Sequence, residues 1–252
     1  MASDDVGFDA TTYGERFADV YDDWYADITD VVACTTTLAR LAGDRPVLEL
    51  GVGTGRLAIP LAERGVEVIG VDSSPAMLVK LAAKPGSDRV EAILGDMADP
   101  PVGDRRFGLV FVAFNTFFNL TSAGEQQRCL DAVARLLDDD ARFVLEAFVP
   151  PDEGDGADGA DRTVVPTRLT TDRVVLTATI HDRPAQTITG QHIDITEAGT
   201  TLRPWKIRYA SPVQLDAMAE KAGLRRADRW AGWTGEPFGP DSPAHVSVYA
   251  RS

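Results

Sequence analysis

A glycine-rich turn and two aspartates carry the chemistry that this sequence suggests. The turn, Gly51-Val52-Gly53-Thr54-Gly55, directly follows an apolar run that contains Glu49. Glycines there let the chain turn sharply and let a ligand lie against bare backbone. Asp72 comes 21 residues after Gly51 at the end of the next apolar run, and Asp96 ends a later one. Carboxylates in these positions can accept hydrogen bonds from ribose hydroxyls and from an adenine amino group, so the pattern predicts an adenosine-containing cofactor.

The glycine spacing helps to choose among such cofactors. The dinucleotide fingerprint is G-x-G-x-x-G/A, but here its last position is Arg56. No lysine follows, so the turn is not a GxxxxGK[ST] phosphate loop either. An NAD-dependent oxidoreductase stays an alternative, because Asp72 would suit the ribose of either cofactor. It is disfavoured by this spacing and by the lack of a Tyr-x-x-x-Lys pair.

Strands alternate with helices through the middle of the chain. Nearly continuous apolar runs predict strands at 46–50, 66–71, 90–94, 107–112 and 141–148. Such runs between amphipathic helices indicate a parallel sheet covered on both faces. Because ligands bind beyond the carboxyl ends of such strands, we expect Glu49–Gly55, Asp72, Asp96 and Asn115 to meet at one edge.

The flanking segments follow other patterns. Aromatic residues at helical spacing predict a helix through 13–25, and a second helix is expected at 30–42. Residues 152–161 are a Gly/Asp run expected to be a solvated loop. β-branched alternation predicts antiparallel strands at 174–180, 187–195 and 202–209, then a helix from Ser211 and last strands at 230–233 and 245–250. The expected division is a helical lid (1–44), a cofactor-binding core (45–150), an acidic loop with a β insertion (151–210), and elements completing the core (211–252).

Composition narrows the class of protein. The net charge is −14, from 39 acidic and 25 basic residues, which argues against nucleic acid as a partner. No apolar run of about 18 residues and no signal peptide is found, so we expect a cytoplasmic protein without a membrane span. Cys34 and Cys129 are expected to be free thiols, and the three scattered histidines indicate no metal site.

Residues 45–150 resemble the class I S-adenosylmethionine-dependent methyltransferases, through the segments VLELGVGTGRLAIPLAERGVEVIGVDSSPAML, LGDMAD and FGLVFVAFNTFFNL. The resemblance implies a doubly wound, mostly parallel, seven-stranded sheet with a final antiparallel strand, and S-adenosyl-L-methionine as cofactor. The contacts that it implies are Glu49, Gly51 and Gly53 along the methionine part, Asp72 and Ser73 at the ribose, Met77, Asp96 and Met97 at the adenine, and Phe114 nearby.

A narrower resemblance concerns the two ends of this core. The segment FADVYDDWY and the β insertion are similar to the sugar N,N-dimethyltransferases of antibiotic pathways. The resemblance implies that Tyr21 and Tyr25 close over cofactor and substrate. Those enzymes carry a basic residue soon after the second tyrosine, whereas Ala26-Asp27-Ile28 follows here. This departure argues against binding of a sugar-nucleotide phosphate.

The sequence thus predicts methyl transfer to an N or O atom of a small molecule, in secondary metabolism. An amine acceptor needs only to lose a proton, whereas a hydroxyl acceptor benefits from a general base. Tyr25 and His181 are the leading catalytic candidates, ahead of His192, His245 and Glu146. Asn115 and Asn119 either orient the substrate or cap the next helix. A non-catalytic S-adenosylmethionine-binding protein remains an alternative, and edge strands of the insertion favour a homodimer.

Overall fold

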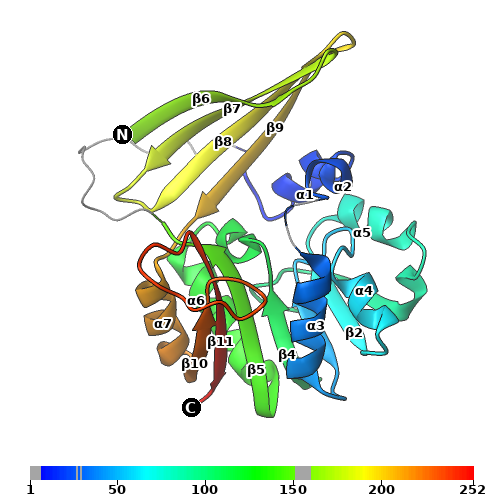
Figure 1. Cartoon of the computed structure of the whole chain (residues 1–252), viewed down its shortest axis with the longest axis vertical. Coiled ribbons are helices and arrows are strands. Elements are labelled where there is room, and N and C mark those ends of the chain that lie inside the picture. Colours follow the sequence, from blue (N-terminus) through cyan, green and yellow to red (C-terminus); the bar gives the residue numbers. More distant parts are fainter. Residues whose placement is uncertain (1–6, 27, 29, 151–159) are drawn as a thin grey trace.

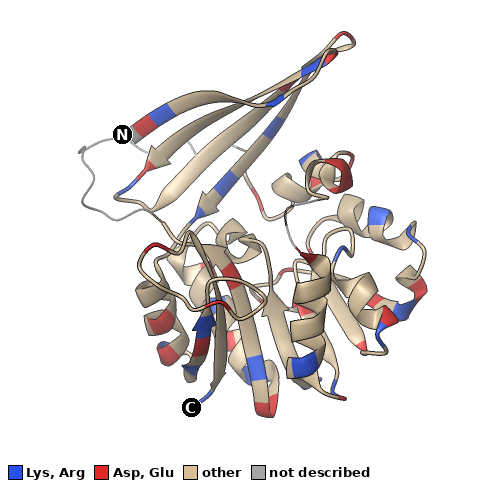
Figure 2. Cartoon of the chain, in the orientation of Figure 1, with Lys and Arg blue, Asp and Glu red and all other residues tan. Residues whose placement is uncertain are grey.

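The computed structural model describes residues 7–26, 28, 30–150 and 160–252, which form two β-sheets with helices around the larger one (Figure 1). The acidic loop expected at 152–161 falls almost wholly outside these residues. Acidic and basic positions are mixed along the ribbon of both sheets (Figure 2). Within the described part of the chain, no helix is long and apolar enough to cross a membrane.

Seven strands form the larger sheet, in the order β10-β11-β5-β4-β1-β2-β3. Their bounds are β1 Val47–Leu50, β2 Val68–Asp72, β3 Val90–Leu94, β4 Phe107–Val112, β5 Leu137–Phe148, β10 Leu224–Trp230 and β11 Ala244–Arg251. Strands β1 to β5 pair in parallel, and β11 is antiparallel to both β5 and β10. The predicted doubly wound, mostly parallel sheet with an antiparallel strand is therefore confirmed. The strand order reverses between β1 and β4, where open α/β sheets bind their ligands.

Both faces of the central strands β1, β2 and β4 are buried, which explains why these strands are apolar without alternation. In β4, Phe111 belongs to a buried cluster with Leu38 of helix α3 (Val31–Ala42), while the adjacent Val110 belongs to another with Leu130 of helix α6 (Ala123–Leu136). Successive side chains of a strand point to opposite faces, so each face must be covered by its own helices. The core thus lies in two layers, one on each side of the sheet.

The described residues form seven α-helices. They are α1 Thr12–Phe17, α2 Tyr21–Trp24, α3 Val31–Ala42, α4 Ala58–Glu63, α5 Pro75–Ala82, α6 Ala123–Leu136 and α7 Pro212–Lys221, with short 3₁₀ helices η1 Ser87–Arg89 and η2 Thr116–Asn119. The helix predicted to begin at Ser211 does so, and α5 begins with the same Ser-Pro pair. The hydroxyl of Ser74 accepts from the Met77 amide, and that of Ser211 accepts from the Gln214 amide.

The β insertion is a separate antiparallel sheet of four strands, in the order β6-β7-β8-β9. They are β6 Ala160–Leu169, β7 Arg173–Asp182, β8 Thr187–Thr196 and β9 Gly199–Arg208. The sequence predicts three of them and misses β6. Pro166 masks that strand, because proline cannot donate to a central ladder. Here it sits on an edge strand beside a shift in register, between Pro166 and Arg168, where proline is tolerated.

One predicted strand is misplaced. The expected strand at 230–233 is instead β10, Leu224–Trp230, which pairs with β11 from Leu224↔Arg251 to Trp230↔Val246. Its sequence LRRADRW is rich in charge because β10 is an edge strand with mostly exposed side chains. Trp233 lies beyond the strand, and its indole N–H donates to Glu146 Oε1 at 2.8 Å.

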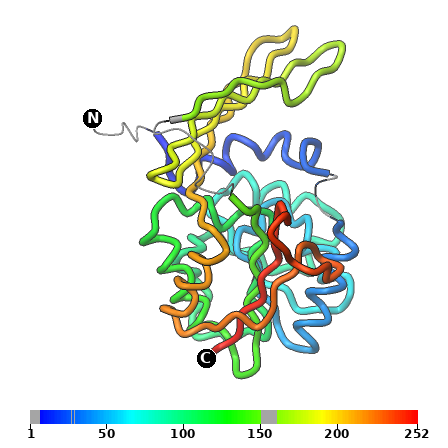
Figure 3. The backbone as a smooth tube through the Cα atoms, turned by 60° about the vertical axis from the view of Figure 1, so that its left-hand side comes forward, coloured from blue at the N-terminus to red at the C-terminus, as the bar shows by residue number. Residues whose placement is uncertain are grey.

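The N-terminal aromatic segment also departs from the prediction of one continuous helix. It forms two short helices, α1 and α2, separated at Ala18–Val20. The carbonyl of Arg16 accepts a hydrogen bond from the Arg203 side chain, which also binds Asp19. The break between α1 and α2 thus coincides with hydrogen bonds from Arg203 of the four-stranded sheet. Figures 1 and 3 both show this segment between the four-stranded sheet and the core.

Candidate active site

The turn after β1 presents bare backbone at the carboxyl edge of the sheet. Gly51, Gly53 and Gly55 have positive φ angles of 73°, 54° and 77°. The amides of Gly51 and Val52 both donate to the carbonyl of Val71 on the neighbouring strand. A Cβ atom at Gly51 would lie 2.3 Å from Thr116 Cγ2. This position therefore requires glycine for conformation and for space.

Asp72 joins this turn to the start of α5. Its Oδ2 accepts from the Gly53 amide at 2.8 Å and its Oδ1 accepts from the Ser74 amide at 2.9 Å. Burial raises the pKa of this carboxyl, while the amides of Ser74 and Gly53 act in the opposite direction. A carboxylate offers about four acceptor sites. Asp72 is thus held rigidly and can still accept from a ligand.

The buried carboxyl of Glu49 and the partly buried guanidinium of Arg56 lie beside the turn, and each has buried polar atoms without a hydrogen-bond partner in the described chain. Glu49 is 5% exposed, and among the described residues its Oε2 has no hydrogen-bond partner. Burial raises the pKa of Glu49 well above its usual value, and the charge of Arg56 opposes that rise. Arg56 Nε and Nη1 are also buried without a partner in the described chain. Unpaired buried charges are costly, so a ligand carrying both an ammonium and a carboxylate would fit this pair.

Three tyrosines of the N-terminal segment stand over this edge. The Tyr13 ring stacks on Phe17 at 4.5 Å between centroids, and its hydroxyl lies near that of Tyr25. Tyr21 packs against Tyr25 at 5.0 Å between ring centroids and lies near Arg56, and burial raises the pKa of Tyr21 to about 12. These hydroxyls are therefore neutral at ordinary pH and act as hydrogen-bonding groups.

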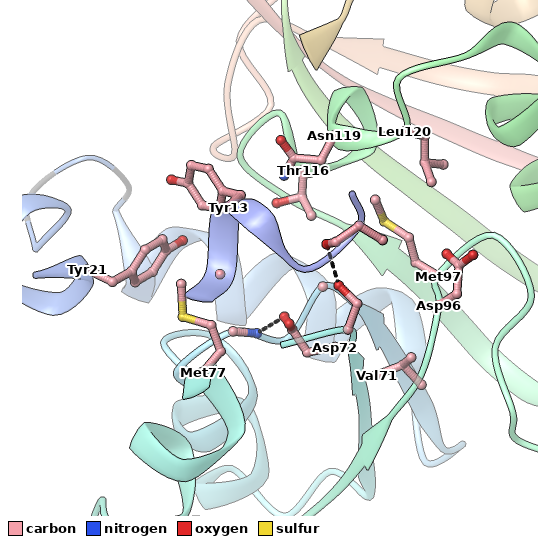
Figure 4. Close-up of a pocket in the computed structure, with 15 residues that line it drawn as sticks. Tyr13, Tyr21, Val71, Asp72, Met77, Asp96, Met97, Thr116, Asn119 and Leu120 are labelled. Carbon is pink, nitrogen blue, oxygen red and sulfur yellow. Dashed lines mark hydrogen bonds between the residues drawn. The ribbon is translucent and has the colours of Figure 1, made fainter. Parts of the chain in front are cut away.

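These groups line a cavity that is open to solvent on one side (Figure 4). Its lining is Ala10, Tyr13, Gly14, Tyr21, Gly51, Gly53, Val71, Asp72, Ser73, Met77, Asp96, Met97, Thr116, Asn119 and Leu120. Figure 4 shows Asp72 at its floor, Asp96 and Met97 at one end, and Tyr21 and Met77 at the other.

The end of β4 is held in an uncommon conformation beside this cavity. Phe114 and Asn115 have positive φ angles of 51° and 62°. Glu146 of β5 accepts from the Phe114 amide through Oε2 at 2.8 Å, and its carbonyl accepts from the Asn115 amide. Asn115 Oδ1 accepts in turn from the Phe148 amide at 2.7 Å. Residues held in such conformations cluster at functional sites, where the surroundings impose them.

Eight of the ten predicted cofactor residues line the cavity: Tyr21, Gly51, Gly53, Asp72, Ser73, Met77, Asp96 and Met97. Glu49 lies behind the turn, close enough to Arg56 to feel its charge. The Phe114 ring lies below Arg56, with the guanidinium carbon 5.7 Å from its centroid. The structure thus brings the whole set to one edge of the sheet.

The three candidate histidines do not line this cavity. His181 hydrogen-bonds to the Tyr209 hydroxyl at 2.7 Å, and His192 to Thr177 at 2.7 Å, packed against Trp24 and Trp205. His245 is fully buried, with Nδ1 2.8 Å from the Ser247 hydroxyl.

The carboxylate of Glu146 is occupied by Phe114 and Trp233. Tyr25 meets the Phe114 ring at 5.9 Å between centroids, beside the cavity. Asn115 does not cap the next helix, because Ser122 does so with Glu125. Asn119 lines the cavity.

Sequence reasoning passes over three residues that the structure brings to the site. Arg56 follows the glycine turn directly, so its place in GVGTGR is the signal that would have found it. Tyr13 opens the aromatic series that also contains Tyr21 and Tyr25. Thr116 reaches the cavity only through the chain reversal at Phe114-Asn115, and no pattern marks it.

The N-terminal segment is attached to the core around the cavity. Glu15 Oε1 accepts from the Ser74 hydroxyl at 2.8 Å and from the Ala76 amide at 3.0 Å, at the start of α5. Ser73 donates to the carbonyl of Ala10 at 2.7 Å. These bonds hold α1 and its tyrosines over the cavity.

The same segment is attached to the β insertion by Arg203. Its guanidinium makes two hydrogen bonds to Asp19, at 2.5 and 2.8 Å, and lies 5.5 Å from the Trp24 ring centroid. Arg168 lies 5.2 Å from the same ring and donates to the Trp24 carbonyl. The insertion thus takes part in placing the tyrosines.

We expect Arg203→Met to loosen this segment. Asp19 is 62% exposed, so water screens the ion pair and its loss should cost only about 1 kcal/mol. Affinity for a ligand of the cavity should fall about fivefold, and trypsin should cleave faster after Arg16. Titration and mass spectrometry of the digest would measure both. Arg225→Met, on exposed β10, is the control, and unchanged cleavage after Arg16 would contradict the expectation.

Comparison with known proteins places this geometry in a family. Residues 47–140 match the model of a methyltransferase domain. The chain is 32% identical over 248 residues to the cypemycin N-terminal methyltransferase of a Streptomyces species, covering 96% of this chain and 99% of that one. It is also similar to the CcbJ methyltransferase from Streptomyces caelestis, with 42% identity, a TM-score of 0.89 and coverage of 97% and 100%.

A third likeness concerns the fold alone. The sugar N-methyltransferase KedS8 from Streptoalloteichus sp ATCC 53650 has a TM-score of 0.68 at 22% identity, covering 100% of this chain and 98% of that one. The family decides against the oxidoreductase alternative and against a protein that only binds the cofactor. Because the likeness extends over nearly the whole chain and the cavity suits an adenosine-containing cofactor with an amino-acid end, this protein belongs to the S-adenosylmethionine-dependent methyltransferases.

Proposed function

We propose that this enzyme transfers a methyl group to an amine nitrogen of a small-molecule acceptor in secondary metabolism. The choice of nitrogen rests on the described lining of this cavity and of a second cavity beside it. Neither lining contains histidine, the side chain that most often acts as a general base. An amine that has lost its proton attacks without a base, whereas a hydroxyl benefits from one. The name of the cypemycin relative, an N-terminal methyltransferase, supports an amine.

The residues of the cavity suit distinct parts of the cofactor. Glu49 would accept from its ammonium and Arg56 would donate to its carboxylate, which satisfies the buried atoms left without partners in the described chain. Asp72 would accept from the ribose hydroxyls, and Ser73 lies beside it. Asp96 would accept from the adenine amino group, with Met77 and Met97 against the ring faces.

When bound, S-adenosylmethionine supplies a methyl group already activated by a sulfonium. The protein's contribution is alignment and exclusion of water. The rigid turn holds one end of the cofactor, and Asp72 holds its middle. Phe114, Tyr21 and Tyr25 pack together as a group of aromatic rings beside the cavity, and α1 contributes Tyr13 and Gly14 to its lining. Tyr25 positions the reactants in this scheme and removes no proton; His181 acts through Tyr209 on the packing of the insertion.

A bifunctional acceptor tests the choice of atom. Enzyme and S-adenosylmethionine are incubated with aromatic compounds that carry an amine and a phenol on one skeleton, and NMR locates the new methyl. We expect N-methylation, at a rate that rises with pH until the acceptor amine itself is deprotonated. O-methylation with a pH profile that belongs to the protein would overturn the proposal and return attention to Tyr25 and His181.

We also propose that the acceptor is not a nucleic acid, that the enzyme is cytoplasmic and that it forms a homodimer. The net charge of −14 disfavours nucleic acid as acceptor, and we expect the enzyme to work in the cytoplasm. Strand β6 is an edge of the four-stranded sheet and carries exposed Val164 and Val165, which supports a homodimer through the insertion. Light scattering would give the mass in solution.

A further inference from the structure

A second cavity adjoins the cofactor cavity and shares part of its wall. It is open to solvent on one side, and its lining is Phe8, Asp9, Ala10, Thr12, Tyr13, Asp96, Asn119, Leu120, Thr121, Glu125, Trp205 and Lys206. Five of these residues also line the first cavity: Ala10, Tyr13, Asp96, Asn119 and Leu120. Methyl transfer requires the methyl donor and the acceptor to meet, and two adjoining cavities that share a wall allow this.

Tyr13 and Asn119 face each other at the join. Figure 4 shows Tyr13 on α1 and Asn119 with Thr116 on the opposite, core side of the first cavity. No hydrogen bond to the Asn119 side chain is found among the described residues, so its amide is available to both compartments. A nucleophile reaching from the second cavity toward the cofactor would pass between these side chains.

The far wall of the second cavity is aromatic. The Trp205 ring of β9 lies flat on β8 at Gly190, where a Cβ atom would be only 2.0 Å from the ring. The indole nitrogen of Trp205 is buried and has no hydrogen-bond partner in the described part of the chain. Phe8 and Tyr13 contribute two more rings to the lining. Aromatic walls of this kind favour a ligand with a ring.

The charge around this cavity is negative. Three carboxylates, Asp9, Asp96 and Glu125, line it with one lysine, Lys206. Hydrogen bonds from Thr11 and Thr12 lower the pKa of Asp9, so that carboxyl stays ionised. Glu125 is held by the amide and the hydroxyl of Ser122, at 2.9 and 2.8 Å. Such a lining attracts a cation and repels a phosphate.

We infer that the second cavity is the acceptor site and that it selects a basic amine attached to a ring and free of phosphate. The inference rests on the proposed transfer to nitrogen and adds the chemical class of the acceptor. Acceptor cations gather at the carboxylates with their ring on Trp205. The ammonium must release its proton to water before the nitrogen attacks, because its lone pair forms the new bond as the methyl–sulfur bond breaks.

Three matched probes test this selection: benzylamine, benzyl alcohol and phenyl phosphate. The enzyme is first saturated with S-adenosylhomocysteine, and each probe is titrated while the ¹⁵N indole signals are recorded. A Trp205→Phe variant assigns the Trp205 signal. We expect benzylamine to shift that signal with an affinity about tenfold above that of benzyl alcohol, and phenyl phosphate to bind most weakly.

Glu125→Gln isolates the charge. Glutamine can keep the reciprocal bonds with Ser122 at the start of α6, so the fold should be retained. Benzylamine should then bind about threefold to tenfold more weakly, with no change for benzyl alcohol. Glu220→Gln, on an exposed part of α7, is the control and should change neither.

Two results would overturn the inference: phenyl phosphate binding better than benzylamine, or a Trp205 signal that no probe shifts. Calorimetric titration with S-adenosylhomocysteine, done first, distinguishes failure of the cofactor assignment from failure of the acceptor class. If the enzyme does not bind S-adenosylhomocysteine, the cofactor assignment is wrong. If it binds S-adenosylhomocysteine but prefers the wrong probe, only the inferred acceptor class is wrong.

Discussion

Asp72→Ala is expected to weaken S-adenosylmethionine binding by at least about 100-fold. The carboxylate would lose charge-assisted hydrogen bonds to two ribose hydroxyls, each contributing about 1.5–3 kcal/mol, and the sum corresponds to a hundredfold or more. The variant also frees the amides of Gly53 and Ser74, which Asp72 holds at 2.8 and 2.9 Å. Calorimetric titration with S-adenosylmethionine and S-adenosylhomocysteine would measure the loss.

Two further variants separate the ligand contact from the fold. Asp72→Asn keeps one acceptor oxygen, so we expect an affinity between those of the parent and the alanine variant. Asp99→Ala removes an exposed carboxylate of the loop after β3 and should leave affinity unchanged. An Asp72→Ala protein that folds and binds within threefold of the parent would show that the ribose is held elsewhere.

Glu49→Gln should change binding and stability in opposite directions. The carboxylate is 5% exposed, and its Oε2 has no partner among the described residues. A neutral amide removes the cost of burying a carboxyl that is ionised in the unfolded chain at neutral pH, so the cofactor-free enzyme should melt about 2–4 °C higher at pH 7. The same change removes the acceptor for the cofactor ammonium, so affinity should fall about 10- to 100-fold.

The melting temperature and the affinity would be measured on the same samples. Glu67→Gln, which alters an exposed carboxylate just before β2, is the matched control and should shift neither quantity. A Glu49→Gln enzyme that is less stable and binds normally would mean that Glu49 serves the fold and not the cofactor.

The raised pKa of Glu49 gives this prediction a pH dependence. Burial raises that pKa well above its usual value, so the folded, cofactor-free enzyme keeps a proton that the unfolded chain releases near pH 4.3. The stability from this group is therefore complete below that pH and is lost as the pH rises through the folded pKa. Below the folded pKa, binding of the ammonium should release a proton, so affinity should increase with pH. Glu49→Gln should abolish the proton release, which calorimetry in two buffers of different ionisation enthalpy detects.

Much of the α/β core could be predicted because its determinants are local. A strand buried on both faces must be apolar throughout, and a glycine turn must follow β1 if a ligand is to approach the backbone. The Ser-Pro starts of α5 and α7 are equally local, since the hydroxyl caps an amide three residues away. These features need no knowledge of distant contacts.

The errors occur where distant contacts outweigh local preference. Strand β6 contains Pro166 and β10 contains four charged residues, yet both are strands because each has a partner on one side and solvent on the other. The break between α1 and α2 coincides with Arg203, which lies almost 190 residues away in sequence. No period in the local sequence records such a partner.

For the site, the sequence by itself determined which residues could hold the cofactor, because parallel strands bring their carboxyl ends to one edge. Glu49, Asp72 and Asp96 follow from that rule alone. Only the tertiary structure decided what surrounds them. Arg56 acquires its role from being buried beside Glu49, and Tyr13 from the bonds that hold α1 over the cavity. Tertiary packing removes water from these groups. An unpaired charge is costly without water, so a ligand that pairs with it is bound favourably.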